Sequence, residues 1–444
     1  MRVKNIGFWI ILFSIITLIF SRAIIYPFFQ DDFFALVTTK IFSFGDIWRL
    51  FLPVSEAVYW RPLGIQLYFG LMQFFGLGQP IWFHLASLSV HLLNTYLVYR
   101  LIRSLRASPS DGRSAAISRI AKLAAFFWGT SPIHYFALGW AVNFSFILVV
   151  TWSILAILAS KEGKIFRAIV FLILGLATNE MAVVIPGLVI LATGRKRIRL
   201  AGSMLAGVAF YVIWRLTVGI KVQGDYGLSL AAPISAFRWY GLWILGWSDI
   251  VRDFIRWGIV FRPEFTKTFP GVVSIYLIEI GVLIWLAKGE WKNKMPVKYF
   301  LWIIIGLTPV LLFQSHLYSH YAAIAAIGFY WWLAEIVVKR ERRLLLMLTW
   351  VMVAAATLGL SYKVSWMADH AAESQRFQRL VLDQTQKGDV SRIYIVSNVP
   401  RAQTVLLGGY GIEYLTGVNR DKVIFVSSLN EVPEGLPDWA VISL

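Results

Sequence analysis

The sequence contains no cysteine, so it can form neither a disulfide nor a thiolate metal site, and it has no thiol nucleophile. It is also poor in charge: only 15% of its 444 residues are Asp, Glu, Lys or Arg, and the 24 acidic residues are far fewer than the 42 basic ones. Hydrophobic residues make up 58% of the chain, and the mean hydropathy is +0.67. A soluble globular protein does not have this composition, whereas a polytopic membrane protein does.

The net charge of +18 does not indicate a nucleic-acid partner, because the basic residues gather in short runs between apolar segments. These runs lie at 2–4, 100–122, 161–167, 195–199, 288–298 and 339–343. Placing them in the cytoplasm predicts about 11 membrane spans, with the N-terminus inside and the C-terminus outside. The predicted spans are 6–26, 82–103, 119–135, 140–160, 166–178, 181–194, 200–219, 271–287, 299–315, 321–338 and 344–361. We expect a multi-pass protein of a prokaryotic plasma membrane.

The segment 168–194 lies between two basic clusters and constrains this topology. A single span would place one of the clusters outside. Two short spans would form a hairpin whose tip, Thr178-Asn179-Glu180, lies below the outer surface in a recess lined by protein. An acidic side chain at that depth needs a partner, which makes Glu180 a candidate functional residue. The alternative is one tilted helix with Glu180 in a structural ion pair.

The segments outside the spans have their own patterns. The outer loop 27–81 contains "PLGIQLYFGLMQFFGLG" and the loop 221–270 contains "RWYGLWILGW", which predict helices lying on the membrane surface. After residue 361 the sequence predicts an amphipathic helix, then strands at "RIYIVS", "KVIFVSS" and "WAVISL", with a helix between the first two. The predicted fold class is therefore an all-α polytopic membrane domain over 1–361, followed by a small extracytoplasmic α/β domain over 362–444.

Two adjacent aspartates, Asp31 and Asp32, directly follow the first predicted span in "YPFFQDDFFA". One of them can cap a helix that begins at Phe33. A carboxylate beside apolar walls can also act as a general base, with a pKa set by its surroundings. Arg61, in "YWRPLG" of the same loop, can grip a phosphate in a bidentate manner, or it can extend to the membrane interface as a structural residue.

Six stretches, taken in order, resemble a known family. They are "DDF", "YWRPLG", "FHLASLSVHLLN", "SPIHYFALGW", "TNEMAVVIP" and "HLYSHYAAIAAIGF". Over about residues 1–340 the chain resembles the GT-C superfamily of polyprenyl-phosphate-dependent glycosyltransferases. It looks most like the protein O-mannosyltransferase branch whose membrane part is followed by tetratricopeptide repeats. The resemblance implies an inverting transfer, outside the membrane, of a sugar such as mannose from a polyprenyl-phosphate donor to a hydroxyl acceptor.

The resemblance also implies roles for individual residues. Asp31 or Asp32 would take the proton of the acceptor hydroxyl, and Asp31 is the favoured base. The other implied residues bind the lipid phosphate or the sugar, and they are Arg61, Glu180, His316, Tyr318, His320 and Tyr321. The relatives carry arginine in the last cluster where this chain has histidine, and Asn179 replaces a lysine that precedes their glutamate.

Cofactors and the acceptor are less constrained by the sequence. The sequence requires no cofactor, and its histidine pair leaves a divalent metal open. No tetratricopeptide repeat follows residue 361, so the acceptor stays open between a protein, a lipid-linked glycan and a cell-wall polymer. The expected partners are the lipid-linked sugar donor, this acceptor and membrane lipid.

Two other functions fit a membrane protein of this kind. A flippase or transporter of lipid-linked glycans would also use intramembrane charges, but it predicts halves related by symmetry and helices broken at the midplane. The sequence shows no such pairing of halves, and its polar groups gather toward the outer face. A catalytically inactive scaffold that presents the C-terminal domain is the third interpretation.

Overall fold

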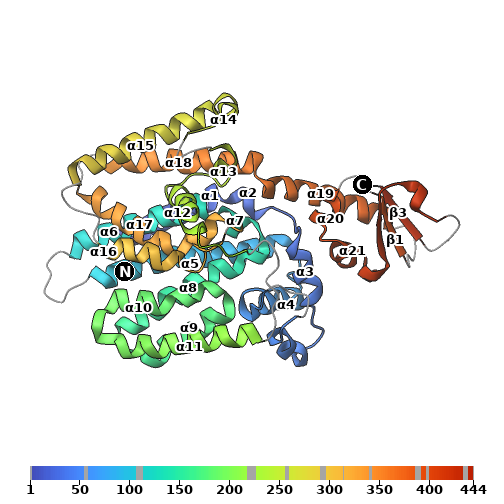
Figure 1. Cartoon of the computed structure of the whole chain (residues 1–444), viewed down its shortest axis with the longest axis horizontal. Helices are drawn as coiled ribbons and strands as arrows, with labels where there is room; N and C mark the ends of the chain where they lie inside the picture. Colours follow the sequence, from blue (N-terminus) through green and yellow to red (C-terminus); the bar gives the residue numbers. More distant parts are fainter. Residues whose placement is uncertain are drawn as a thin grey trace.

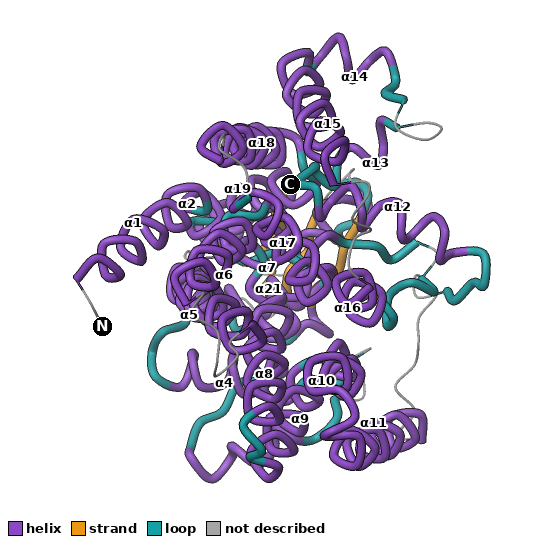
Figure 2. Tube along the Cα trace, turned by 90° about the vertical axis from the view of Figure 1, so that its left-hand side faces the viewer, coloured by secondary structure: helices purple, strands orange, loops and turns teal. Residues whose placement is uncertain are grey.

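The computed structural model describes residues 3–54, 59–106, 114–217, 227–255, 260–290, 297–313, 315–339, 343–385, 392–396, 400–433 and 439–443. The protein is mostly helical and ends in a small parallel β-sheet (Figure 1). Figure 2 shows many of the helices end on, gathered side by side. Parts of the predicted basic runs 100–122, 288–298 and 339–343 lie outside the described residues.

Within the described part of the chain, five helical segments are long and apolar enough to cross a membrane. They are α5 (Pro80–Arg106), α8 (Phe144–Lys161) with η4 (Ala141–Asn143), α11 (Ile198–Thr217), α17 (Ala323–Val338) with η8 (Ser319–Ala322), and α18 (Arg343–Val364). Shorter helices with apolar sequences are α1 (Val3–Ile19), α9 (Ile165–Thr178), α10 (Ile185–Thr193) with η5 (Glu180–Val184), α15 (Pro270–Glu290) and α16 (Val297–Leu307). The helix α6 (Ser114–Gly129) packs against α5 and α17.

The connecting segments contain short helices. Those of the α type are α2 (Ser21–Ile24), α3 (Asp31–Thr38), α4 (Leu67–Phe74), α7 (Tyr135–Gly139), α12 (Ala232–Ile244), α13 (Val251–Phe254) and α14 (Pro263–Thr268). The others are η1 (Phe44–Phe51), η2 (Pro62–Gln66), η3 (Pro132–His134) and η6 (Gly194–Arg197). The C-terminal part contains α19 (Trp366–Thr385), α20 (Pro400–Val405), α21 (Gly409–Thr416), η9 (Arg420–Lys422), η10 (Leu429–Glu431) and strands β1 (Arg392–Val396), β2 (Val423–Val426) and β3 (Trp439–Ser443).

A helix occupies each of the predicted spans, but three of these helices end early. The helices α1, α6 and α16 end at Ile19, Gly129 and Leu307, whereas the predicted spans run to 26, 135 and 315. The residues that follow are still apolar and are in part buried inside the protein, as Ala23, Ile133 and Val310 are. Hydropathy therefore stays high beyond the helix end and does not reveal it.

The predicted hairpin in segment 168–194 is confirmed. The helix α9 ends at Thr178, and Asn179 is extended, with φ −164° and ψ 146°. Its side chain accepts a hydrogen bond from the amide of Met181 at 2.9 Å and so caps η5, which leads into α10. The guanidinium of Arg197, after α10, lies beside Gly163, before α9, so the chain returns to the side from which it came (Figure 1).

The two segments predicted to lie on the membrane surface are helical, and each packs one face against the protein. Gly64 in η2 lies so close to the carbonyl oxygen of Thr178 and to Ser145 that a Cβ atom would collide with both. In α12, Trp239 and Trp243 are buried. Each of these apolar stretches can form a helix with an apolar face. Such a face can be buried against other helices, as η2 is against α8 and α9, or in lipid.

The C-terminal sheet has the strand order β2-β1-β3, with both neighbours parallel to the central strand. All three predicted strands are present, but the single helix predicted between the first two is broken into α20 and α21, where Leu407 and Gly408 have φ angles of 51° and 61°. The long α19 continues from the end of α18 and carries this domain beside α3 (Figure 1).

Candidate functional site

Asp31 and Asp32 form the first turn of α3, so the helix begins two residues earlier than predicted. Asp32 is buried, with 1% of its surface exposed. Its Oδ1 accepts a hydrogen bond from the amide of Val142 at 2.8 Å, and its Oδ2 accepts one from the amide of Phe29 at 3.3 Å. Burial raises the pKa of Asp32 well above its usual range, although these hydrogen bonds oppose the shift. Oδ1 of Asp32 therefore ties α3 to η4, and Oδ2 ties α3 to the backbone directly before it.

Asp31 has a different environment. It is half-buried and hydrogen bonds to the side chain of Tyr59, with the charge of Arg61 nearby. Burial raises the pKa of Asp31, and the Tyr59 hydrogen bond and the Arg61 charge partly oppose this shift. A carboxylate with a raised pKa is a stronger base than one in water. Both aspartates have a raised pKa, but both oxygens of Asp32 already accept backbone hydrogen bonds and its side chain is buried, so the half-buried Asp31 is the better suited of the two to accept a proton from a ligand.

Gln30, directly before Asp31, has φ 49° and ψ −124°, a conformation that only glycine adopts readily. Its amide donates a hydrogen bond to the carbonyl oxygen of Val405 at 2.7 Å. A second contact from the C-terminal domain to this loop region runs from the hydroxyl of Tyr414 to the carbonyl of Gly78 at 3.2 Å. The C-terminal domain thus holds the backbone from which Asp31 extends.

Gln30→Gly is expected to raise the free energy of unfolding by about 1 kcal/mol, because strain at such a residue costs on the order of 1–3 kcal/mol. The measurement is the melting temperature of the purified protein in detergent. Gln73→Gly is the matched control: Gln73 lies inside α4, where glycine is expected to destabilise the protein by about 1 kcal/mol. A lower melting temperature for both variants would contradict the account of Gln30.

An ion-pair cluster lies at the tip of the hairpin. Arg61 Nε donates to Glu180 Oε2 at 2.8 Å, and Arg215 Nη1 pairs with the other oxygen of Glu180. Arg215 also donates to the hydroxyl of Tyr211 at 3.3 Å. Glu180 therefore pairs with two arginines, and it joins the segment before η2, the hairpin and α11.

The turn at 316–321 reaches the same cluster through Phe146 of α8. The guanidinium carbon of Arg61 lies 4.9 Å from the centre of the Phe146 ring. That ring is 4.6 Å from the ring of His320 and 5.0 Å from that of Tyr321. His320 is 3% exposed, and neither of its ring nitrogens has a hydrogen-bond partner among the described residues. A buried imidazole whose ring nitrogens lack partners can hydrogen bond to the oxygen atoms of a bound ligand.

The other predicted members of this turn lie against His320. The ring of Tyr318 stacks on that of His320 with centres 5.6 Å apart. The ring of His316 is 5.0 Å from that of Tyr318 and 6.0 Å from that of Tyr321. Together with the ion-pair cluster and Asp31, all the predicted site residues except Asp32 thus form one chain of contacts.

An apolar groove of about 530 Å³ lies between α9 and α11 and leads to this cluster. Its α11 wall is one helix face that runs from Ser203 to Trp214, the residue before Arg215. Trp60, the residue before Arg61, lines the groove and packs against Trp214, with ring centres 4.6 Å apart. Tyr211, which also lines the groove, accepts a hydrogen bond from Arg215, so one end of the groove adjoins the ion-pair cluster although none of the three charged residues lines it.

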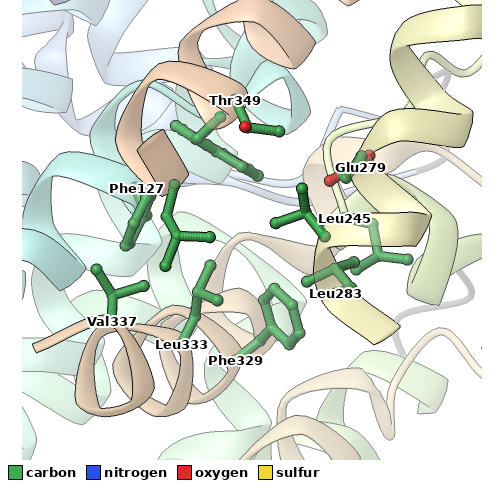
Figure 3. A pocket seen from close by; sticks show the side chains of 11 residues that line it. Phe127, Leu245, Glu279, Leu283, Phe329, Leu333, Val337 and Thr349 are labelled. Atoms are coloured by element: carbon green, nitrogen blue, oxygen red, sulfur yellow. The ribbon is translucent and has the colours of Figure 1, made fainter. Parts of the chain in front are cut away.

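A second cavity is too small for a substrate. It lies between α15, α17 and α18, and Figure 3 shows it lined mainly by apolar side chains such as Phe127 and Leu333, with the carboxyl of Glu279 at one side. Its volume is about 30 Å³, close to that of one water molecule. The Glu279 carboxylate accepts a hydrogen bond from Trp247 Nε1 at 2.9 Å, so this carboxyl is satisfied within the protein.

Three histidines of the family-like stretches hydrogen bond to backbone carbonyl groups within the protein. His84 Nδ1 lies 2.9 Å from the carbonyl oxygen of Leu138, and His91 Nε2 lies 2.9 Å from that of Gly129. His134 Nε2 lies 2.9 Å from the carbonyl oxygen of Trp128. Among the described residues, no group of three or more His, Asp and Glu side chains could hold a metal ion.

Several site residues were not predicted from the sequence. Tyr59, Tyr211 and Phe146 are aromatic residues in an aromatic-rich chain, and nothing in their spacing sets them apart. Arg215 lies in the last turn of the apolar helix α11, and its pairing with Glu180 joins residues 35 positions apart in the chain. No protein-family model and no curated protein matches this chain.

Proposed function

We propose that the protein is an integral-membrane glycosyltransferase of the GT-C kind, which transfers a sugar from a polyprenyl phosphate to an extracytoplasmic hydroxyl group. The observation that carries this proposal is the apolar groove between α9 and α11, one end of which adjoins the cluster of Arg215, Glu180 and Arg61 through Tyr211. The charge of Arg61 also acts on Asp31. A lipid-linked sugar has the same order of parts: an apolar chain, an anionic phosphate and a polar sugar.

The groove suits the isoprenoid chain, since its lining is almost entirely apolar and one of its walls follows α11 for about 16 Å at 1.5 Å per residue. The phosphate would then lie at the arginine pair, because planar guanidinium groups bind phosphate oxygens in a bidentate manner. His320, with two ring nitrogens that lack partners among the described residues, is a further phosphate ligand in this proposal.

In the proposed transfer, the acceptor hydroxyl gives its proton to the Asp31 carboxylate while its oxygen bonds to the anomeric carbon. The bond between that carbon and the phosphate oxygen breaks, and its electron pair leaves with the polyprenyl phosphate, so the configuration inverts. The phosphate gains one negative charge as Asp31 loses one. The arginine charge that faced Asp31 can therefore stabilise the leaving phosphate, and the total charge of the site stays constant.

The full topology belongs to the same proposal: about 11 spans, a cytoplasmic N-terminus and an extracytoplasmic C-terminal domain. It is supported by the match between the predicted spans and the described helices, which comprise the five long apolar segments, five shorter apolar ones and α6. In this arrangement the cluster at Glu180 lies near the outer face, opposite the basic ends of α5 and α10.

The test uses purified protein in lipid nanodiscs and polyprenyl-phosphate sugars labelled in the sugar. We expect polyprenyl phosphate to raise the melting temperature and the label to move from lipid to a water-soluble product. If neither occurs for any sugar, the proposal is wrong. Label that stays on the lipid but crosses the bilayer of a proteoliposome would instead indicate a transporter of lipid-linked glycans.

Tyr59→Phe is expected to move the acidic limb of the pH–rate profile to higher pH. Asp31 must be ionised to act as a base, and the Tyr59 hydrogen bond lowers the pKa of Asp31 by stabilising the carboxylate. Without the hydroxyl the pKa rises further, so activity is lost at a higher pH as the solution is acidified. The measurement is kcat/KM against pH, and Tyr96→Phe, on α5 away from the site, is the control that keeps the wild-type profile.

A further inference from the structure

Two adjoining cavities of about 280 and 330 Å³ are lined in part by Leu317 and Tyr318 of the 316–321 turn, and they share no lining residue with the apolar groove. They share Arg252, Leu317, Tyr318 and Trp366, and we name them together the Trp366 cleft. Each has a volume near the lower end of the range of about 300–1,000 Å³ for sites that bind small molecules. Unlike the apolar groove, the cleft is lined by charged and polar side chains as well as aromatic ones.

The cleft is close to the proposed base and to the phosphate site. Gln30 lines it, and Gln30 directly precedes Asp31. Tyr318 lines both of its parts and stacks on His320. A molecule in the cleft would therefore approach the cluster from a direction that the groove leaves open.

Aromatic rings form part of its wall. Trp366 stacks on Phe136, with ring centres 5.5 Å apart and planes at 21°, and it meets Trp140 edge to face at 5.3 Å. Tyr318 lies 6.3 Å from Trp366. The face of an aromatic ring carries negative charge, and the C–H groups on one face of a sugar ring carry weak positive charge, so the two stack favourably.

Hydrogen-bond donors and acceptors are placed around these rings. Arg252 and Asp253 are exposed side chains that line the cleft, and the Nε1–H of Trp140 is buried with no partner among the described residues. Asp249, which accepts a hydrogen bond from the amide of Ser319 at 3.1 Å, has its pKa raised by burial to about 7. Hydroxyl groups both donate and accept, so they suit a wall that offers both kinds of partner.

We propose that the Trp366 cleft binds the acceptor, and that this acceptor is a saccharide, so that transfer takes place to a glycan hydroxyl. The transfer step rests on the proposed function, whereas saccharide binding does not. An extended peptide is the less suitable ligand, because peptides commonly bind by adding a strand to a sheet edge. The described strands β1–β3 do not line the cleft, whose walls are helix ends and turns.

The test measures binding of the full-length protein in nanodiscs to an array of linear and branched oligosaccharides and to an array of peptides containing Ser and Thr. We expect binding to oligosaccharides that Trp366→Ala and Arg252→Ala each weaken by about tenfold or more. Trp48→Ala and Arg262→Ala are the matched controls, since both side chains are exposed and line none of the cavities described above. Arg252 is itself exposed, so its variant is expected to fold even if Trp366→Ala does not.

Three results would overturn the inference: binding to peptides alone, no binding to either array, or wild-type saccharide binding in both cleft variants. The melting-temperature shift caused by polyprenyl phosphate is measured in parallel and is expected to persist in all four variants. Loss of that shift in the wild type would count against the proposed function, whereas an intact shift with no saccharide binding would count against the cleft alone.

Discussion

Replacing Asp31 with Asn is expected to lower kcat by about 10²–10⁴-fold, the usual contribution of a general base. Asn has the same size as Asp, and its side-chain oxygen can keep the hydrogen bond that Asp31 makes with Tyr59. It cannot take a proton from the acceptor hydroxyl at neutral pH. The melting-temperature shift with polyprenyl phosphate should therefore remain, and the loss should appear in the rate of sugar transfer.

The neighbouring aspartate provides the matched control. Asp32→Asn removes one of two oxygens that accept backbone hydrogen bonds and places an NH₂ group opposite the amide of Val142 or Phe29. An unsatisfied buried amide costs about 1–3 kcal/mol, so this variant should melt at a lower temperature but keep its activity per folded molecule. If Asp32→Asn abolishes transfer and Asp31→Asn does not, the roles of the two residues are reversed.

Most of the helices could be predicted from the sequence, because in a membrane protein a long apolar run favours a spanning helix and a basic cluster favours the cytoplasmic side. Even the hairpin at Asn179 followed from length, since residues 168–194 are too few for two ordinary spans and their flanking cations must lie on one side. The ends of α1, α6 and α16 were not predictable, because apolar residues buried by protein and by lipid look alike in sequence.

Site residues could be predicted where their residue type is rare in the sequence, and they could not where that type is common. Acidic residues are few in this chain, so Asp31 and Glu180 stood out. The contact between Arg61 and Glu180 joins residues far apart in the chain, and no local pattern records it. Trp366 belongs to a composition that is 16% aromatic, so only its position beside Tyr318 distinguishes it.

The difference between the two aspartates shows the same limit. Adjacent residues in a helix point in different directions, about 100° apart for 3.6 residues per turn. One of them therefore meets the amides of Val142 and Phe29, and the other meets Tyr59. The two carboxyls lie in the same short stretch of sequence. Their structural and chemical roles differ because segments distant in the chain, those of Val142 and Tyr59, pack against them.

The second large effect is expected for Arg61→Gln, which should lower kcat by about 10²–10³-fold, the usual effect of removing one group that stabilises developing charge. Arg61 contacts Glu180 and the ring of Phe146, and its charge acts on Asp31. Gln cannot take up the charge that the phosphate gains as its bond to the sugar breaks. Arg61→Lys should recover only part of the rate, because lysine keeps the charge but not the planar fork.

The control for this prediction is an ion pair of the same type at the opposite ends of the helices. Arg106 pairs with Glu335, and both side chains are partly buried, as those of Arg61 and Glu180 are. Arg106→Gln should lower the melting temperature and leave kcat per folded molecule unchanged, since its end of α5 is remote from the groove and from Asp31. Equal losses of transfer in the two variants would mean that Arg61 acts only through stability, and the phosphate site would then have to be sought at Arg215 and His320.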